Sequence, residues 1–592
     1  MGRGRHEAGS NAVCQKGGGG ASLKFWENAA SLTFSGPSLR RFGKSRIVVV
    51  ESSNLVRRAA RVARAGRGAR HVGAVCAASL IFAACSRSSV DTPSLASRAP
   101  LDVSSEETPF DIVASVPVPP ADGPKLVPLK LASPVRARPD KAAEKIGYLR
   151  IGARVARSHE SVSTRDCAGG WYAIRPLGFV CAGRDATIRL DDPLARALAV
   201  EPERAKPLPY AYAFTRASVP NYLEVPTLAQ QLEVEDAPWA PEAEVSGAAA
   251  GVSSVGGSAL AKSALAAGPA APSGAEDGYP IGGTASDEPP WWLAGPRLIP
   301  QLAPFDVVPG SIVANVSPRH AGVALIGTFL GGAASNRRRF AITTDARLLP
   351  ADKLESEAGS AFRGQDLRGL GLPVAFAGRQ RARFWQLVGA RLEPGRALGR
   401  REFVPLSGTV RMLAGERMVE TRDGQWLRSA DLHVAAKPRE LPAFAQADRR
   451  WIDVSITNQM LVLWEGSTPV YATLVSTGKD GLGDPRKTQS TPQGTFQIQQ
   501  KHITSSMDSD AADNEFELRD VPWVMYFKGG YALHGAYWHD DFGRQRSHGC
   551  VNMAPIDARH VFEWTLPEVP EHWHGAYAAE SIGRGTLIRI GR

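Results

Sequence analysis

The pattern of apolar and polar positions predicts β-structure over the last quarter of the chain. Residues 451–457 alternate between apolar and polar side chains, and a short apolar run at 459–464 follows. A Glu-Gly pair then leads into another run, as expected where a hairpin turns. The further predicted strands are 469–477, 490–498, 524–527, 531–534 and 586–590, and helical spacing occurs at 555–566. Residues 450–592 are therefore expected to form a β-sandwich with one short helix.

Shorter β-type runs and two low-complexity segments organise the rest of the chain. Runs separated by turn residues in 126–190 suit a small barrel, and 291–440 is again β-rich. Residues 241–290 consist mainly of Ala, Gly, Ser and Pro, which cannot build a core and indicate a flexible linker. The predicted order is a leader (1–85), a linker (86–125), a small barrel (126–190), a connecting segment (191–240), a linker (241–290), a β-rich accessory region (291–440) and the sandwich (450–592). The fold class is mainly β, with several domains.

Two stretches of the accessory region share one pattern, Thr-x-Asp-x-x-apolar-Leu. It begins at Thr343 in the first stretch and at Thr421 in the second. A duplicated β module and a chance similarity both remain open at this stage.

The positive charge of the protein belongs to its N-terminus. The net charge is +11, and the first 85 residues contain 14 Lys or Arg and 3 acidic residues. The remaining residues carry 56 of each kind, so the predicted working domains are balanced. A nucleic-acid partner, which would favour a basic surface, is therefore not expected.

The N-terminus has the pattern of an export signal. Arginines between 57 and 70 precede a mostly apolar run at 72–84, which is too short to span a bilayer comfortably. Residues 82–85, Phe-Ala-Ala-Cys, resemble a lipobox with Cys85 as the lipidated residue, and simple cleavage after Ala84 is the alternative. A leader of this kind predicts a location in the cell envelope on the periplasmic side, with a lipid anchor as the membrane contact. The unusual length ahead of it predicts a true start near Val50 or Val56.

The cysteines outside the leader fall into two groups. Cys167 and Cys181 are candidates for a disulfide in an oxidising compartment. Cys550 lies outside that pairing and is the only cysteine in the last four hundred residues. It follows Ser547, His548 and Gly549, and His534-Gly535 precedes this group by a short interval. A thiol attacks as its thiolate, and a nearby imidazole is the usual proton acceptor, so this arrangement indicates nucleophilic catalysis.

The segment His-Gly-x11-Ser-His-Gly-Cys-Val-Asn resembles the signature of the L,D-transpeptidase family with its YkuD-like catalytic domain, which remodels bacterial peptidoglycan. Ser-Thr-Gly-Lys at 476–479 and Thr-Pro-x-Gly-Thr-Phe at 491–496 extend the resemblance over residues 450–592. Separately, residues 135–139, 170–172 and 178–180 resemble bacterial SH3-like domains. In that family such modules often bind the cell wall, and a purely structural barrel is the alternative.

The resemblance implies a role for each residue of the motif. Cys550 would attack the bond between the third residue of a peptidoglycan stem and the following D-alanine. His534 would take the thiol proton and return it to the leaving D-alanine, with its ring oriented by the carbonyl of Gly535. Backbone N–H groups of Gly549 and Cys550, with His548 nearby, would hold the oxyanion. No cofactor is needed.

Other residues near the motif are predicted to shape the loop or to bind substrate. Ser547 and Asn552 would support the loop and contact substrate, and Tyr526 and Trp538 would form walls of the cleft. Arg546 or Arg544 would bind the free carboxylate of the stem. A metal site is the competing chemistry, because several histidines and aspartates lie close in sequence, but the ligand spacing fits no known zinc motif.

The expected activity is acyl transfer from a tetrapeptide stem through a thioester. An amine of a second stem would give a 3–3 cross-link, and a lysine of an envelope protein would give protein attachment. Water as acceptor would make the enzyme an L,D-carboxypeptidase. A non-catalytic wall-binding scaffold is the alternative from a different class of function.

Overall fold

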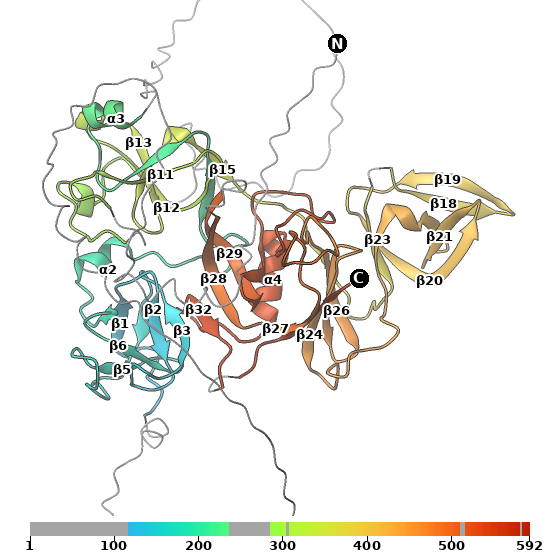
Figure 1. The fold of residues 1–592 in the computed structure, drawn as a ribbon, viewed down its shortest axis with the longest axis horizontal. Coiled ribbons are helices and arrows are strands. Elements are labelled where there is room, and N and C mark those ends of the chain that lie inside the picture. Colours follow the sequence, from blue (N-terminus) through green and yellow to red (C-terminus); the bar gives the residue numbers. More distant parts are fainter. Residues whose placement is uncertain (1–115, 236–283, 303–306, 380, 510–515, 581–582) are drawn as a thin grey trace, which may run out of the picture. The chain divides into compact units, whose positions relative to one another are not determined.

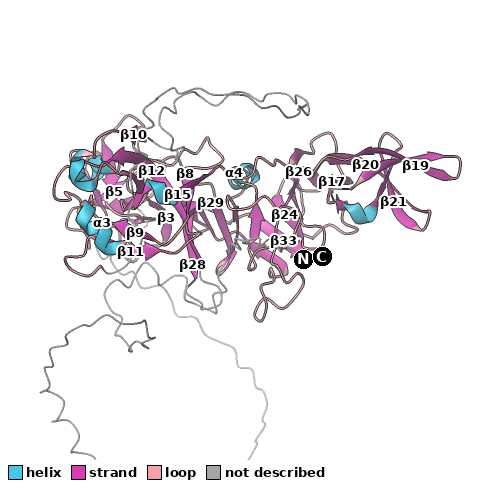
Figure 2. Ribbon diagram, turned by 90° about the horizontal axis from the view of Figure 1, so that it is seen from above, coloured by secondary structure: helices cyan, strands magenta, loops and turns pink. Residues whose placement is uncertain are grey.

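The computed structural model describes residues 116–235, 284–302, 307–379, 381–509, 516–580 and 583–592. The fold is mainly β, as predicted, with strands in every part that is described (Figures 1 and 2). Three α-helices occur in these residues, α2 (Pro193–Ala197), α3 (Leu228–Val234) and α4 (Pro555–Trp564). The leader and the lipobox-like Cys85 lie outside the described residues.

The first described region is a small barrel of short strands. Its buried apolar residues include Leu126, Val135 and Ile146. Cys167 and Cys181 are joined in a disulfide with a Cα–Cα distance of 5.9 Å. β1 pairs with β4 and β7, while β2 pairs with β3 and β6. The strands are β1 (Lys125–Pro128), β2 (Ser133–Arg136), β3 (Lys145–Leu149), β4 (Val155–Ala156), β5 (Trp171–Ala173), β6 (Phe179–Cys181) and β7 (Ala186–Thr187).

Two further modules share one pairing scheme. In module A the strands pair in the order β11-β9-β14-β13-β12-β8-β15. In module B the order is β19-β18-β22-β21-β20-β17-β23, with corresponding strands in the same chain order. The strands of module A are β8 (Ala211–Thr215), β9 (Val219–Tyr222), β11 (Val313–Ser317), β12 (Gly322–Leu330), β13 (Arg339–Thr343), β14 (Leu348–Pro350) and β15 (Leu354–Glu357), with β10 (Thr284–Ser286) beside β12. Those of module B are β17 (Val374–Ala377), β18 (Arg383–Val388), β19 (Arg391–Ala397), β20 (Phe403–Leu413), β21 (Glu416–Thr421), β22 (Trp426–Arg428) and β23 (Leu432–Ala435).

The repeated Thr-x-Asp pattern forms the same turn in both modules. Thr343 Oγ1 donates to Asp345 Oδ1 at 2.5 Å, and Thr421 Oγ1 donates to Asp423 Oδ1 at 2.6 Å. Each threonine oxygen also accepts the backbone N–H four residues later, at 2.9 and 3.0 Å. One strand and a single 3₁₀ turn follow in each case, Ala351–Lys353 and Ser429–Asp431. This shared turn, together with the shared pairing order, favours duplication of one module over chance similarity.

The expected roles of 191–240, 241–290 and 291–440 need correction. β8 and β9 come from the predicted connecting segment, yet they pair with β12 and β11 from the predicted accessory region. The Ala/Gly/Ser/Pro-rich segment therefore lies within the sequence of module A and does not separate two domains. Composition identified the low-complexity segment, but it carries no information on which flanking strands pair.

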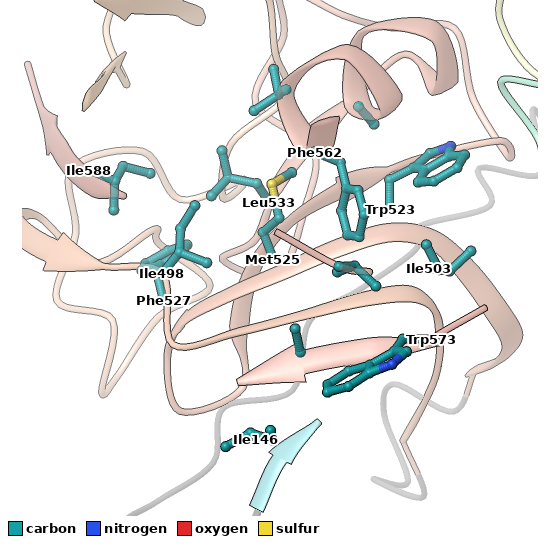
Figure 3. Packing of buried hydrophobic residues seen from close by; sticks show 14 of the residues in the cluster. Ile146, Ile498, Ile503, Trp523, Met525, Phe527, Leu533, Phe562, Trp573 and Ile588 are labelled. Carbon is teal, nitrogen blue, oxygen red and sulfur yellow. The ribbon is translucent and has the colours of Figure 1, made fainter. Parts of the chain in front are cut away.

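The C-terminal region is a two-sheet sandwich around one apolar core. Figure 3 shows Phe562 of α4 beside Met525 and Leu533 of the second sheet, and all three are buried. The helix begins at Pro555, which suits a first helical position because proline lacks an N–H. The first sheet contains β24 (Arg450–Ser455), β25 (Met460–Glu465), β26 (Thr468–Leu474), β27 (Gly494–Gln497), β33 (Leu587–Gly591) and the short β16 (Gln365–Asp366). The second contains β28 (Gln500–Ser509), β29 (Phe516–Lys528), β30 (Tyr531–Gly535), β31 (Val551–Met553) and β32 (Gly575–Tyr577).

A buried aspartate on β29 joins the sandwich to the small barrel and to module A. Asp520 forms an ion pair with Arg150 and accepts hydrogen bonds from Thr344 and, at 2.6 Å, from Thr504. Its backbone carbonyl accepts from the Tyr212 hydroxyl. Burial alone would raise the pKa of Asp520, but the charge of Arg150 and the donated hydrogen bonds hold it well below its ordinary value.

A second buried aspartate, Asp557 on α4, lies inside the sandwich. It accepts from Tyr471 at 2.7 Å, from the Gly364 N–H at 2.9 Å, and from Thr473. Burial raises the pKa of this carboxyl to about 6, despite the donated hydrogen bonds.

The Asp557 carboxyl predicts a pH dependence of stability. Its folded-state pKa of about 6 lies above the ordinary value of 3.8, so the folded state holds the proton more tightly. The free energy of unfolding should therefore fall as pH rises from 4 to 7, by roughly 2.4 kcal/mol from this group. Asp557→Asn should lose this decrease in urea unfolding at pH 4, 5, 6 and 7. Asp366→Asn, at the surface of β16, is the matched control; equal pH dependence of wild type and Asp557→Asn would contradict the prediction.

Candidate active site

Parallel pairing of β30 and β31 brings the two predicted reactive residues together. His534 is the Cα partner of Asn552 on β31, and Cys550 immediately precedes that strand. Because side chains alternate across a strand, Cys550 and Asn552 project to one face and Val551 to the other, where it joins the sandwich core. The Cys550 sulfur lies 3.3 Å from the Ala532 backbone nitrogen. The pairing therefore places Cys550 and His534 on the same face of adjacent strands, with Cys550 directly before the partner strand and His534 opposite Asn552.

The imidazole of His534 is oriented by its own strand. Nδ1 lies 3.1 Å from the Gly535 carbonyl oxygen. A carbonyl only accepts, so Nδ1 carries the proton and Nε2 is left as the basic nitrogen. Burial lowers the pKa of His534 to about 4, against the smaller opposite effect of that hydrogen bond. The ring is therefore neutral at physiological pH and can accept a proton at Nε2.

The loop before Cys550 depends on a glycine and a serine. Gly549 has φ of +124°, and a Cβ there would lie 2.5 Å from a ring carbon of Tyr531. Ser547 Oγ donates to the Cys550 carbonyl at 2.5 Å and accepts the Gly549 N–H at 3.1 Å. Ser547 thus shapes the loop from inside, and the Gly549 N–H, which was predicted to hold an oxyanion, is engaged by that serine.

The segment 476–479, Ser-Thr-Gly-Lys, braces the same loop through its backbone. Ser476 exchanges two hydrogen bonds of 2.9 Å with Asn552, and the Lys479 N–H donates to the Ser547 carbonyl at 2.8 Å. The Gly478 N–H donates to Thr491 Oγ1 at 2.9 Å. The Ser-Thr-Gly-Lys segment therefore holds the cysteine loop in place, and Thr491 in turn fixes that segment.

His539 is a site residue that the sequence did not single out, except as one possible metal ligand. Its Nδ1 accepts the Asp541 N–H at 3.2 Å, so its Nε2 carries the proton and donates. Nε2 lies 3.1 Å from the Asn552 amide group, which must present its oxygen to this donor. Burial, then the charge of Arg546, lowers the pKa of His539 to about 3. A neutral His539 therefore fixes Asn552 beside the reactive pair.

The remaining predicted site residues are each described by their burial and their contacts. Trp538 is buried, with its ring centroid 5.6 Å from that of His534. Tyr526 lies on β29 in the apolar cluster that contains Cys550, with its hydroxyl 3.2 Å from Ser505 Oγ. His548 is buried, and Arg546 forms an ion pair with Asp541.

One expectation about a side chain near the site needs correction. His574, expected at the surface of a loop, is buried, with Nε2 2.9 Å from Thr504 Oγ1. The His574 N–H donates to the carbonyl of Tyr148 on β3, so its segment contacts a strand that is distant in the sequence. No local sequence pattern indicates this pairing.

Neither a metal site nor a membrane span is found in the described part of the chain. No group of three or more His, Cys, Asp or Glu there is arranged to hold a metal ion. No helix among these residues is both long and apolar enough to cross a bilayer.

Comparisons with known proteins agree on the C-terminal region. Residues 449–590 match the family model described as YkuD, the L,D-transpeptidase catalytic domain. A Bacillus subtilis protein named "Putative L,D-transpeptidase YciB" is 26% identical over 148 residues, which cover 21% of this chain and 62% of that protein. This chain thus spans less than two thirds of that relative.

Solved structures of L,D-transpeptidases are also similar to parts of this chain. The catalytic domain from Enterococcus faecium is 20% identical, with a TM-score of 0.18, over 24% of this chain and 98% of that one. An enzyme from Mycobacterium smegmatis is 16% identical, with a TM-score of 0.19, over 40% of this chain and 89% of that one. Residues 449–590 of this chain are thus similar to the catalytic domain of the YkuD L,D-transpeptidase family.

Proposed function

We propose that this protein is a peptidoglycan L,D-transpeptidase with Cys550 as nucleophile and His534 as general base. One observation carries the proposal: the Nδ1 of His534 is held 3.1 Å from the Gly535 carbonyl, beside the strand that Cys550 precedes. That arrangement leaves Nε2 basic on the same face as the Cys550 thiol, and a base on that face is what thiol activation requires.

The reaction has two stages. Nε2 of His534 takes the thiol proton, and the Cys550 sulfur bonds to the carbonyl carbon of the third stem residue. The C–N bond to D-alanine then breaks, and the imidazolium returns its proton to the leaving amine. The resulting thioester is attacked by an amine, which forms the new amide and restores the thiol. The protein supplies positioning and proton transfer, and no cofactor is consumed.

An oxyanion forms in each stage and needs a donor. Because Ser547 engages the Gly549 N–H, we assign the primary role to the Cys550 N–H. A rotation of the Ser547 hydroxyl side chain would release the Gly549 N–H as a second donor. Asn552, held by His539, is proposed to contact the stem rather than the reacting carbonyl.

The acceptor and the location extend the proposal. A second stem as acceptor gives a 3–3 cross-link, a lysine of an envelope protein gives protein attachment, and water gives carboxypeptidase activity. We propose a place in the cell envelope on the periplasmic side, with a lipid on Cys85 as the membrane anchor. The small barrel, which resembles SH3-like domains in sequence, is proposed to bind the wall.

The direct test is turnover of a disaccharide-tetrapeptide by the full chain, assayed with a reductant because the mechanism needs a thiol. Products are separated by liquid chromatography and identified by mass. Dimers joined through tetrapeptide and tripeptide stems, with release of D-alanine, are expected. If tripeptide is the only product, the activity is hydrolysis and not transfer. Unchanged substrate would overturn the proposed function in favour of a non-catalytic wall-binding scaffold.

A further inference from the structure

A cavity of about 170 Å³ lies between module B and the loop that links His534 to Cys550. Module B contributes Arg379, Arg400, Arg401 and His433, and the catalytic loop contributes Asp541 and Arg544. Cavities of roughly 150 Å³ hold a molecule of about six heavy atoms, such as benzene. The space therefore suits one small residue and not a sugar chain.

The cavity is shaped by close packing across the two parts. His433 Nδ1 lies 2.9 Å from the Asn458 carbonyl oxygen. A Cβ added at Gly378 of module B, or at Gly543 of the catalytic loop, would lie 2.8 Å from His433 Nε2. Gly543 also has φ of +97°, a conformation that suits glycine. Both glycines are thus needed to bring the walls together around His433.

The charge of the cavity is strongly positive. Of its lining residues four are arginines and one, Asp541, is acidic, and that carboxylate already forms an ion pair with Arg546. Arg400 and Arg401 both contact Asp540, yet the buried Nη1 of Arg401 has no hydrogen-bond partner among the described residues.

The remaining two guanidinium groups are available to a ligand. Arg379 is 3.8 Å from Asp431 and is largely exposed. Arg544 is exposed, and no side-chain ion pair of this residue occurs in the described part of the chain. Guanidinium groups bind carboxylates through paired, charge-assisted hydrogen bonds, so this cavity favours a small anionic ligand.

The cavity is connected to the reactive residues through a short series of contacts. Phe542, in its wall, has its ring centroid 4.9 Å from that of His539. His539 in turn contacts Asn552, the Cα partner of His534. A ligand bound here would therefore contact the same loop that presents Cys550.

We propose that this cavity binds the free carboxyl terminus of a stem peptide, with Arg379 and Arg544 receiving the carboxylate and Arg401 Nη1 supporting it. The inference that the ligand is a stem peptide rests on the proposed function. The inference that it carries a carboxylate rests on the arginines of the cavity itself. A terminal alanine with its carboxylate has six heavy atoms, which matches the available volume. Module B is then part of the substrate-binding surface and contributes three of the four arginines.

Binding of a defined peptide tests this site. The probes are Nα-acetyl-L-lysyl-D-alanine and its C-terminal amide, titrated by ligand-observed NMR into the full chain with Cys550→Ser, which prevents turnover. The acid is expected to bind about tenfold more tightly than the amide. Arg379→Gln and Arg544→Gln should each remove most of this preference. Arg391→Gln, a surface arginine of β19 outside the cavity, is the matched control and should preserve it.

Several results would overturn the site. Equal affinity for acid and amide would do so, as would an equal loss in the Arg391→Gln control. Inorganic phosphate that displaces the peptide at equal concentration would make this a general anion site and reject the carboxylate assignment.

Wild-type turnover of disaccharide-tetrapeptide, measured in parallel, separates this site from the proposed function. If the protein prefers the acid but shows no turnover, the carboxylate site is supported and the transpeptidase assignment is rejected. Turnover without that preference would remove the cavity assignment alone.

Discussion

Cys550→Ser is expected to lower the rate of acyl transfer by roughly four to six orders of magnitude, the usual effect of losing a catalytic nucleophile. A serine hydroxyl is a much weaker acid than a thiol, and His534, whose pKa is lowered to about 4, is a weak base for it. The substitution changes one buried atom, so folding and wall binding should be retained. Transfer is measured by release of D-alanine from a disaccharide-tetrapeptide under reducing conditions.

The matched comparison is wild-type protein with its thiols alkylated, which should lose activity to a similar extent. Binding of both forms to purified cell wall, followed by sedimentation, checks that the loss concerns chemistry alone. Near-normal D-alanine release by the serine variant would refute the assignment of Cys550 as nucleophile.

His534→Gln is expected to lower the same rate by roughly two to four orders of magnitude, the typical contribution of a general base. Glutamine approximates the size of the ring but cannot accept the thiol proton at neutral pH. His572→Gln is the matched control, since His572 is a partly exposed residue that pairs with Glu201 at 3.0 Å. A loss of the same size in both variants would contradict a specific role for His534.

The pH profile of the wild-type enzyme adds a second criterion for His534. Protonation of Nε2 removes the base, so kcat/KM should fall as pH decreases through the pKa of this residue. Because burial lowers that pKa to about 4, the acid limb is expected near pH 4. An acid limb near 6.5, the ordinary histidine value, would contradict a buried, neutral His534.

Local sequence patterns predicted the features of the site that depend on neighbours in the chain. The strand that ends at His534-Gly535, the helix from Pro555 and the Ser-His-Gly-Cys turn are each encoded within a few residues. Gly535 also orients the imidazole of the preceding residue, so one dipeptide contains both groups. Alternation and turn chemistry carry the strands and the helix directly, whereas the roles of the motif residues are implied by the resemblance to the L,D-transpeptidase family.

Residues whose roles depend on distant partners were missed. His539 fixes Asn552 only because β30 and β31 pair in parallel, and Asp557 accepts bonds from residues more than 80 positions away in the sequence. Asp520 contacts Arg150 across 370 positions. The local periodicity of a single sequence does not show which distant strands pair. For the same reason the two halves of module A were assigned to different regions.

The most direct test of a Cys550 thioester is the mass of the intact protein during turnover. The reduced full chain is incubated with a disaccharide-tetrapeptide, quenched in acid within seconds and analysed by mass spectrometry. The mechanism predicts a transient increase equal to the substrate mass less D-alanine, located on the peptide that contains Cys550 and absent from the Cys550→Ser variant. Turnover without any adduct, or an adduct on another residue, would contradict the central claim that this cysteine carries the acyl group.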